Sequence, residues 1–299
     1  MSPCLLVILL LASGCAREGA VREPEKIIGG QGIGPGEFMN PRCIATGPDG
    51  AVYVIDKTAR VQRFSPDGEF ETSWQMPEWS AGKPTGIMVD AQNRVWVADT
   101  HYARIIIFDR DGNELERYGR GEGEGPGQFI FPTHTALAPD GTRYVSEYGG
   151  NDRISRFSAT WEYLGSFGCQ GGATALRRPQ AIALDRDNTL WVADAGGHRI
   201  CQFSPDGKLL KSFGSMGSAP GQLRFPYGLA LCPDGTLLVS EFENNRVQRF
   251  DRTGKCLEIW GGPGRGPGQF AETWGVAVGK DNRFYVVDSK NHRVQMFRM

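Results

Sequence analysis

The residues of this chain best suited to chemistry are four histidines, His101, His134, His198 and His292. A catalytic zinc normally needs three converging protein ligands, and imidazole is a common one. Only His134 begins a short apolar run, whereas His198 and His292 each directly precede an arginine. The spacing therefore predicts no three-histidine metal centre. The sequence also contains neither a Gly-x-Ser-x-Gly nucleophile elbow nor EF-hand spacing, so we assign no catalytic residue, metal or cofactor.

A second chemical pattern is an acidic residue followed four to six positions later by an arginine, and it occurs six times. A group that recurs in every copy of a repeat cannot mark a single site. The guanidinium fork suits a buried carboxylate, so we interpret these residues as structural ion pairs that fix a loop. The pairs are Asp56 with Arg60, Asp99 with Arg104, Glu147 with Arg153, Asp194 with Arg199, Glu241 with Arg246, and Asp288 with Arg293.

These pairs belong to a unit that recurs six times between about residue 27 and the end of the chain. Each copy ends its arginine segment on a phenylalanine, and successive phenylalanines are 44 to 49 positions apart. Each unit predicts four short strands separated by Pro, Asp and Gly turns. The second strand is almost entirely apolar, as in residues 190–193, which indicates that both of its faces are buried. Short four-stranded sheets buried on both faces predict a β-propeller. The phenylalanines are Phe64, Phe108, Phe157, Phe203, Phe250 and Phe297.

The two ends of the repeat array complement each other. The last copy stops at Met299, after its third predicted strand, and residues 25–30 resemble the fourth strand of the preceding copy, residues 257–261. We therefore expect the N-terminal strand to complete the last blade and close the ring, which would shield otherwise open sheet edges.

The repeats resemble NHL repeats. The resemblance rests on the loop Gly266-Pro267-Gly268-Gln269-Phe270 and its counterparts, on the acid that ends the second strand, and on the Arg-[Ile/Val]-x-x-Phe strand. It implies an all-β, six-bladed NHL propeller over residues 25–299. Some NHL propellers are peptidyl-hydroxyglycine amidating lyases with three zinc-binding histidines at strand starts, and only His134 occupies such a position here. A metal-dependent lyase or hydrolase at the channel mouth is therefore the alternative function.

In a propeller, the first strands of all blades line a central channel, so the residues that start these strands should converge at its mouth. Five of them differ from one another and could form a polar cup rimmed by aromatic rings. Such a cup suits a sugar, a peptide or another small polar ligand. The same residues could instead cap the channel and hold ordered water. The candidate ligand-binding residues are Arg42, His134, Gln180, Tyr227 and Trp274.

The N-terminus predicts export. Residues 4–12 are apolar but shorter than the roughly 20 residues of a membrane span, which is typical of a secretory signal. Small residues before Cys15 resemble the lipobox of bacterial lipoproteins, which implies cleavage before Cys15 and lipidation of its sulfur. We expect a signal peptide over residues 1–14, a lipidated tether over residues 15–24, and attachment to a bacterial cell envelope. The other interpretation is an ordinary secretory signal, with Cys15 incidental.

The charge balance bears on partners. The chain has 33 Lys and Arg against 34 Asp and Glu, a formal net charge of −1. Nucleic-acid binders usually carry a basic excess, so RNA binding, which some animal NHL propellers perform, is not expected. The sequence favours an envelope-anchored scaffold that binds a ligand or protein, with no catalytic centre of its own.

Overall fold

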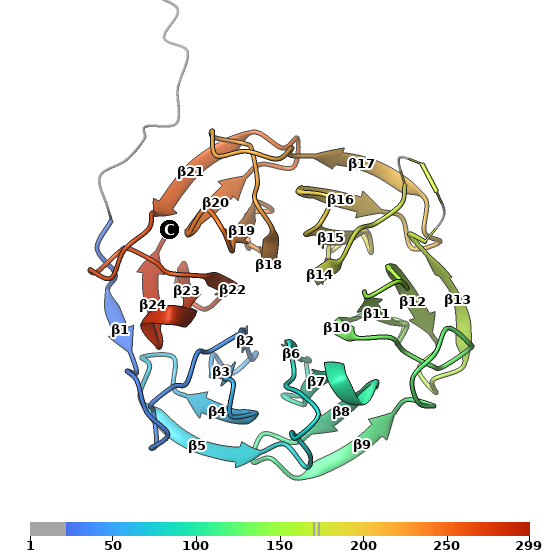
Figure 1. Ribbon diagram of the computed structural model, residues 1–299, viewed down its shortest axis with the longest axis horizontal. Helices are drawn as coiled ribbons and strands as arrows, with labels where there is room; N and C mark the ends of the chain where they lie inside the picture. The colour runs from blue at the N-terminus through green and yellow to red at the C-terminus, as the bar shows by residue number, and fades with distance from the viewer. Residues whose placement is uncertain (1–21, 170, 173) are drawn as a thin grey trace, which may run out of the picture.

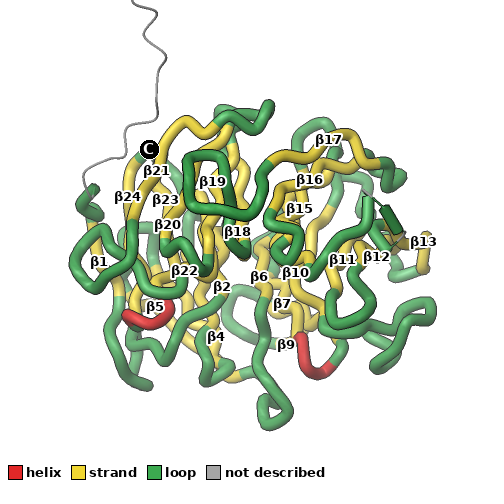
Figure 2. Tube along the Cα trace, turned by 45° about the horizontal axis from the view of Figure 1, so that its top comes forward, coloured by secondary structure: helices red, strands yellow, loops and turns green. Residues whose placement is uncertain are grey.

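The computed structural model describes residues 22–169, 171–172 and 174–299, and it is a six-bladed β-propeller. Six four-stranded antiparallel sheets stand around a central axis (Figure 1). The expected signal peptide and Cys15 lie outside the described residues. Within the described ranges, no helix has the length and apolar character needed to cross a membrane. The only helical elements there are two short turns, η1 (Thr100–Tyr102) and η2 (Ser289–Asn291), which lie toward the same face of the ring (Figure 2).

The innermost strand of each blade lines the axis. Three of these strands begin at a proline and two more begin two residues after one, which fixes the backbone where the chain enters the sheet. The loop before each strand and the loop after the next strand open on one face, which we call the mouth face. In blade order the inner strands are β2 (Cys43–Thr46), β6 (Gly86–Val89), β10 (Pro132–Leu137), β14 (Pro179–Leu184), β18 (Pro226–Leu231) and β22 (Thr273–Val278).

The second and third strands hold the core of each blade. They are buried along almost their whole length, because each sheet is covered on both faces by its neighbours. The second strands are β3 (Val52–Ile55), β7 (Val95–Asp99), β11 (Arg143–Glu147), β15 (Leu190–Asp194), β19 (Leu237–Glu241) and β23 (Arg283–Asp288), and the third strands are β4 (Arg60–Phe64), β8 (Arg104–Phe108), β12 (Arg153–Phe157), β16 (Arg199–Phe203), β20 (Arg246–Phe250) and β24 (Arg293–Arg298).

The outer strands form the circumference, and the N-terminal one closes the ring as the sequence predicts. β1 pairs antiparallel with β24, with Ile28 opposite Val294, so blade six has the order β1-β24-β23-β22. Glu25 adds an ion pair to Arg298 at 2.5 Å. The outer strands are β5 (Phe70–Gln75), β9 (Glu114–Tyr118), β13 (Tyr163–Phe167), β17 (Leu209–Phe213), β21 (Cys256–Gly261) and β1 (Lys26–Ile28).

Each repeat acid is fully buried and contacts the arginine of its own blade. In five blades the acid also accepts a backbone N–H from the loop that enters the blade, as Asp288 does from Ala271 at 2.7 Å. The pair therefore ties the second and third strands to the preceding loop. The shortest nitrogen–oxygen distances are 3.5 Å for Asp56–Arg60, 2.7 Å for Asp99–Arg104, 2.9 Å for Glu147–Arg153, 2.7 Å for Asp194–Arg199, 2.5 Å for Glu241–Arg246 and 2.6 Å for Asp288–Arg293.

Candidate functional site

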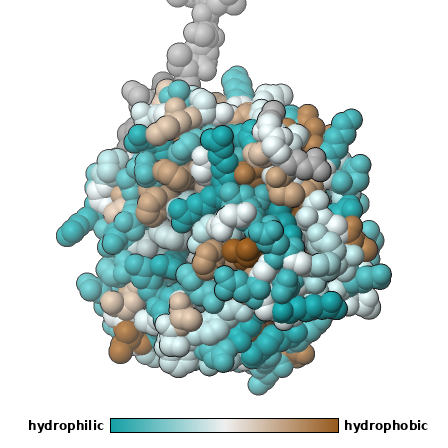
Figure 3. Space-filling view, turned by 45° about the vertical axis from the view of Figure 1, so that its right-hand side comes forward, coloured by the Kyte–Doolittle hydropathy of each residue, from teal (hydrophilic) through white to brown (hydrophobic). Residues whose placement is uncertain are grey.

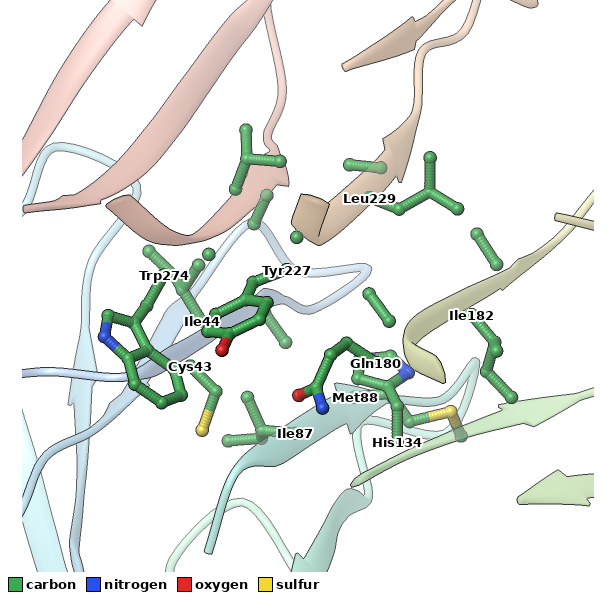
Figure 4. A pocket seen from close by; sticks show the side chains of 18 of the residues that line it. Cys43, Ile44, Ile87, Met88, His134, Gln180, Ile182, Tyr227, Leu229 and Trp274 are labelled. Carbon is green, nitrogen blue, oxygen red and sulfur yellow. The ribbon is translucent and has the colours of Figure 1, made fainter. Parts of the chain in front are cut away.

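The inner strands enclose a cavity of about 360 Å³ along the axis. All five candidate residues line it, together with Thr85 and Thr133. Figure 4 shows Tyr227, Gln180 and His134 around one opening, with Trp274 beside them and aliphatic side chains such as Ile182 and Leu229 along the walls. In a space-filling view, apolar atoms show near the middle of an otherwise mostly hydrophilic face (Figure 3). The channel thus combines an apolar wall with a few polar groups, which is the usual composition of a small-molecule site.

Backbone bulges set the direction of the residues at the channel mouth. The pairing between first and second strands shifts register at the start of β10, β14, β18 and β22, but not in β2 or β6. A bulge inserts an extra residue and re-aims the side chains next to it. Gln180, Tyr227 and Trp274 all lie within or beside these shifts. The sequence analysis placed these residues at strand starts but did not detect the bulges.

An aromatic cluster forms one side of the mouth. The Tyr227 ring lies 5.0 Å from that of Phe242 and 4.9 Å from that of Trp274, and Phe242 meets Trp274 nearly edge-on at 5.6 Å. A second pair, Phe131 and Tyr148, stacks at 5.3 Å. Aromatic rings with partly exposed faces offer stacking surfaces to a planar ligand.

Arg42 projects a cation into this aromatic environment. Its guanidinium carbon lies 5.0 Å from the centre of the Trp274 ring, a cation–π contact. Within the described part of the chain, no carboxylate comes within 4.0 Å of it, and its buried Nε has no hydrogen-bond partner. Burial lowers the pKa of Arg42, because desolvation disfavours the charged form. Arginine nevertheless keeps its charge in proteins, so the mouth carries a positive charge with no carboxylate in direct contact among the described residues.

His134, on the next inner strand but one, is uncharged at neutral pH. Burial lowers its pKa to about 4, and its Nδ1 atom is buried without a hydrogen-bond partner. The neighbouring Gln180 is 6% exposed; its backbone oxygen accepts hydrogen bonds from Thr133 and Ser146, and its side-chain amide forms none within the described residues. Its amide group therefore remains available to a ligand in the cavity.

The other three histidines do not join His134. His198 Nδ1 accepts the backbone N–H of Phe225 at 3.2 Å, and His292 Nδ1 accepts that of Asn40 at 3.1 Å, so both connect adjacent blades. His101 packs against Phe131, and burial, together with the charges of Arg42 and Lys83, lowers its pKa. Among the residues that the structure describes, no group of three His, Cys, Asp or Glu side chains could hold a metal ion.

Sequence reasoning missed a ring of residues with left-handed backbone conformation just before the inner strands. Arg178, for example, has φ 54° and extends over the rings of Tyr148 and Tyr227 at 5.1 and 5.6 Å. Their constant spacing of 47 positions was a usable signal, since non-glycine residues rarely adopt this conformation without a structural reason. The residues with this spacing are Phe131, Arg178, Phe225 and Glu272, with φ between 42° and 55°, and Asn40 has the same conformation in blade one, with φ 50°.

Comparisons with known proteins agree with the repeat structure. The NHL repeat family model matches residues 176–203, 223–250 and 270–297, which correspond to blades four, five and six. NHL repeat-containing protein 3 of Mus musculus is 28% identical over 182 residues, which cover 55% of this chain and 52% of that protein. Peptidyl-glycine alpha-amidating monooxygenase B of Xenopus laevis is 26% identical over 210 residues, 62% of this chain and 23% of that protein. The chain thus spans about half or less of the length of these relatives.

A solved structure of a streptogramin B lyase superimposes with a TM-score of 0.65 at 17% identity, covering 90% of this chain and 95% of the lyase chain. At this identity the similarity concerns the fold. Together with the matched repeats, it establishes the chain as an all-β six-bladed propeller that carries NHL repeats.

Proposed function

We propose that this NHL-repeat propeller is a binding scaffold whose ligand or partner segment docks at the mouth of the central channel. The observation that carries the proposal is the convergence of Arg42, His134, Gln180, Tyr227 and Trp274 on one cavity. These are positions at which an otherwise regular repeat differs from blade to blade. A symmetric frame acquires selectivity only where its symmetry is broken, and here the differences gather at one opening.

The chemistry of the mouth supports binding to a molecule with both planar and polar parts. The Tyr227, Phe242 and Trp274 rings supply stacking area, while Gln180 and Arg42 supply directed hydrogen-bond donors. A cavity of about 360 Å³ can admit a small molecule or the end of a peptide, but not a folded domain. A protein partner would therefore insert a terminus or a loop.

The alternative function, a metal-dependent lyase or hydrolase, draws on the similarity to an amidating monooxygenase over 62% of the chain. It requires metal ligands that converge. Of the histidines, only His134 lines the channel, and His198 and His292 are engaged in contacts between blades. The geometry of the described residues therefore favours the scaffold function over the lyase.

We also propose that the propeller is exported and held at a bacterial cell envelope by lipid on Cys15. The support is the apolar segment and the small residues before that cysteine. Expression in bacteria with an alkyne-bearing fatty acid should label the wild-type protein, and Cys15→Ser should abolish the label. Equal labelling of both proteins would contradict lipidation at this residue.

The binding proposal is tested by capture from extracts of cells that make the protein, using one variant altered at the mouth and one altered on the circumference. Trp274→Ala removes part of the aromatic wall, and Leu164→Ala removes an outer-strand leucine that is 45% exposed. We expect material captured by the wild type to be retained by Leu164→Ala and reduced at least about tenfold by Trp274→Ala, because buried aromatic anchors dominate binding energy. Gln180→Ala, a smaller change in the same cavity, should weaken capture in the same direction. Equal capture by all four proteins would contradict the proposal.

A further inference from the structure

Arg42 differs in kind from the repeat arginines. Each of the six repeat arginines contacts a fully buried carboxylate of its own blade at 2.5 to 3.5 Å. Arg42 has no carboxylate within 4.0 Å among the described residues, although its side chain is only partly exposed. Partly burying a charge without a carboxylate beside it is costly, and the cation–π contact with Trp274 offsets only part of that cost. Such a charge is expected where an external group completes the pair.

The surroundings of Arg42 place no carboxylate in direct contact with it, and Glu272 acts on it only from beyond 4.0 Å. The corresponding residues of the other blades, Thr85, Thr133, Gln180, Tyr227 and Trp274, are all uncharged, so Arg42 is the one charged residue at this level of the channel.

Two carboxylates, those of Glu272 and Glu243, lie near the mouth, and each has a basic side chain beside it. Glu272 is within 3.8 Å of Lys290, and Glu243 is within 3.7 Å of Arg224. Lys83 and Arg178 add positive charge toward the outside of the mouth. The local field therefore attracts an anion and guides it toward Arg42.

We propose that Arg42 binds a carboxylate of the ligand, that the adjoining unsaturated or aromatic part of the ligand lies against Trp274 and Tyr227, and that Gln180 hydrogen-bonds a polar group further along the molecule. The ligand is thus an organic carboxylate, either the C-terminus of a peptide or a free small acid. This inference rests on the proposed function, because it assigns a chemical class to the same site.

A carboxylate suits the site better than a phosphate. The planar fork of one guanidinium matches the two oxygens of one carboxylate, and the charges cancel one to one. A phosphate monoester carries nearly two negative charges, and the second would have to be met by Arg178, which is exposed and lies over Tyr148 and Tyr227 instead of beside Trp274. The flat rings beside Arg42 also favour a ligand whose acid is conjugated or attached to a planar group.

The test uses two matched pairs of probes in ligand-observed NMR titrations. Hippurate carries an aryl ring, an amide and a carboxylate, and hippuramide is its neutral counterpart. The tripeptide Gly-Gly-Phe and its C-terminal amide form the second pair. We expect the acid of at least one pair to bind at least about tenfold more tightly than its amide, the size expected for a charge-assisted bond. A larger preference in the hippurate pair identifies a small acid, and a larger one in the peptide pair identifies a peptide terminus.

Variants then assign that preference to Arg42. Arg42→Gln should abolish the preference for the acid over the amide, and Arg42→Lys should keep part of it. The matched control is Arg110→Gln, an exposed arginine in the turn between β8 and β9 at the opposite end of its blade. Because Arg42 pairs with no carboxylate and its one cation–π contact is weak, Arg42→Gln should fold and melt near the wild-type temperature. A large loss of melting temperature would instead assign Arg42 a structural role and overturn the proposal.

The outcomes separate this inference from the proposed function. If acid and amide bind equally and Trp274→Ala weakens both, the mouth is a binding site but Arg42 is not a carboxylate anchor. If Arg42→Gln retains the preference, the carboxylate binds elsewhere and the inference is wrong. If Trp274→Ala also leaves capture from cell extract unchanged, the proposed function fails with it.

Discussion

The two halves of the ring are built from the same repeat but are joined differently. In blades four to six, the left-handed residue that precedes the repeat arginine accepts a backbone N–H from the next blade, through His198 to Phe225, Asn245 to Glu272 and His292 to Asn40, at 3.2, 2.6 and 3.1 Å. We call these contacts interblade latches. In blades one to three the corresponding residues are Ala59, Ala103 and Asp152, and none forms a latch in the described structure.

Unsatisfied polar groups follow the same division. Nine residues of blades one to three have a buried side-chain nitrogen or oxygen without a hydrogen-bond partner, against two residues of blades four to six, among those described. Buried polar atoms without partners are costly and are found where a structure serves something besides stability. The nine are Arg42, Tyr53, Arg60, Arg63, Trp74, Asp99, Arg104, His134 and Arg143, and the two are Thr273 and Arg283.

This comparison indicates that the two sets of blades contribute different kinds of side chain to the mouth of the channel. The latched blades contribute the stacking wall through Tyr227 and Trp274, on a backbone that the NHL repeat model matches. The unlatched blades contribute Arg42 and His134, whose polar atoms are incompletely satisfied. Blades four to six, the regular half, thus fix the shape of the mouth, and blades one to three, the irregular half, supply the positive charge of Arg42.

The largest expected effect comes from a glycine in the irregular half. A Cβ atom on Gly86 would lie 1.8 Å from the backbone oxygen of Thr133, so the approach of β6 to β10 depends on its absence. At the corresponding Gly275, the nearest atom would be a flexible methyl of Ile44 at 3.3 Å. We expect Gly86→Ala to lower the free energy of unfolding by about 3 kcal/mol or more, and Gly275→Ala by less than about 1 kcal/mol, as measured by urea titration. Equal losses would show that β6 and β22 pack alike against their neighbours at this position.

The contrast between these glycines shows what the sequence could and could not predict. The four-strand repeat, the closure by β1 and the position of each acid and arginine follow from local composition and fixed spacing. The latches and bulges do not, because each depends on how two segments are placed against each other. His198 and Phe225 lie 27 positions apart, in different blades, and neither residue type by itself indicates a shared hydrogen bond. Arg42 was identifiable as a departure from the repeat, but its lack of a carboxylate partner is a property of the folded ring alone.

An intermediate effect is expected from acidification, through His134. Its pKa is about 4 in the folded protein and about 6.5 in an unfolded chain, so between these values the unfolded state binds the extra proton. The contribution of His134 to stability is therefore complete above about pH 6.5 and is lost as the pH falls toward 4. The free energy of unfolding of the wild type, measured relative to His134→Gln, should decrease by about 1.4 kcal/mol per pH unit in this window, up to about 3 kcal/mol in all.

The variant His134→Gln is the proper reference because it keeps a polar side chain of similar length and has no titrating group in this range. Carboxylates elsewhere titrate in both proteins and cancel in the difference. Parallel stability curves for the two proteins from pH 7 to pH 4 would show that His134 remains hydrated in the folded protein and is not one of the costly groups of the irregular half.

The smallest effect tests the latches themselves. His198→Ala removes the acceptor of the Phe225 N–H and should lower the free energy of unfolding by about 1 kcal/mol, the usual net value of one hydrogen bond. His198→Asn should restore most of it, because Asn245 makes the same contact one blade further on, at 2.6 Å. The matched control is Asp152→Ala in blade three, at a position that forms no latch, and it should change stability by less than about 0.5 kcal/mol. Urea titration measures all three, and hydrogen exchange of the Phe225 amide localises the change. If His198→Asn is as unstable as His198→Ala, the contact between the rings of His198 and Phe225, 4.6 Å apart, holds the two blades together instead of the hydrogen bond.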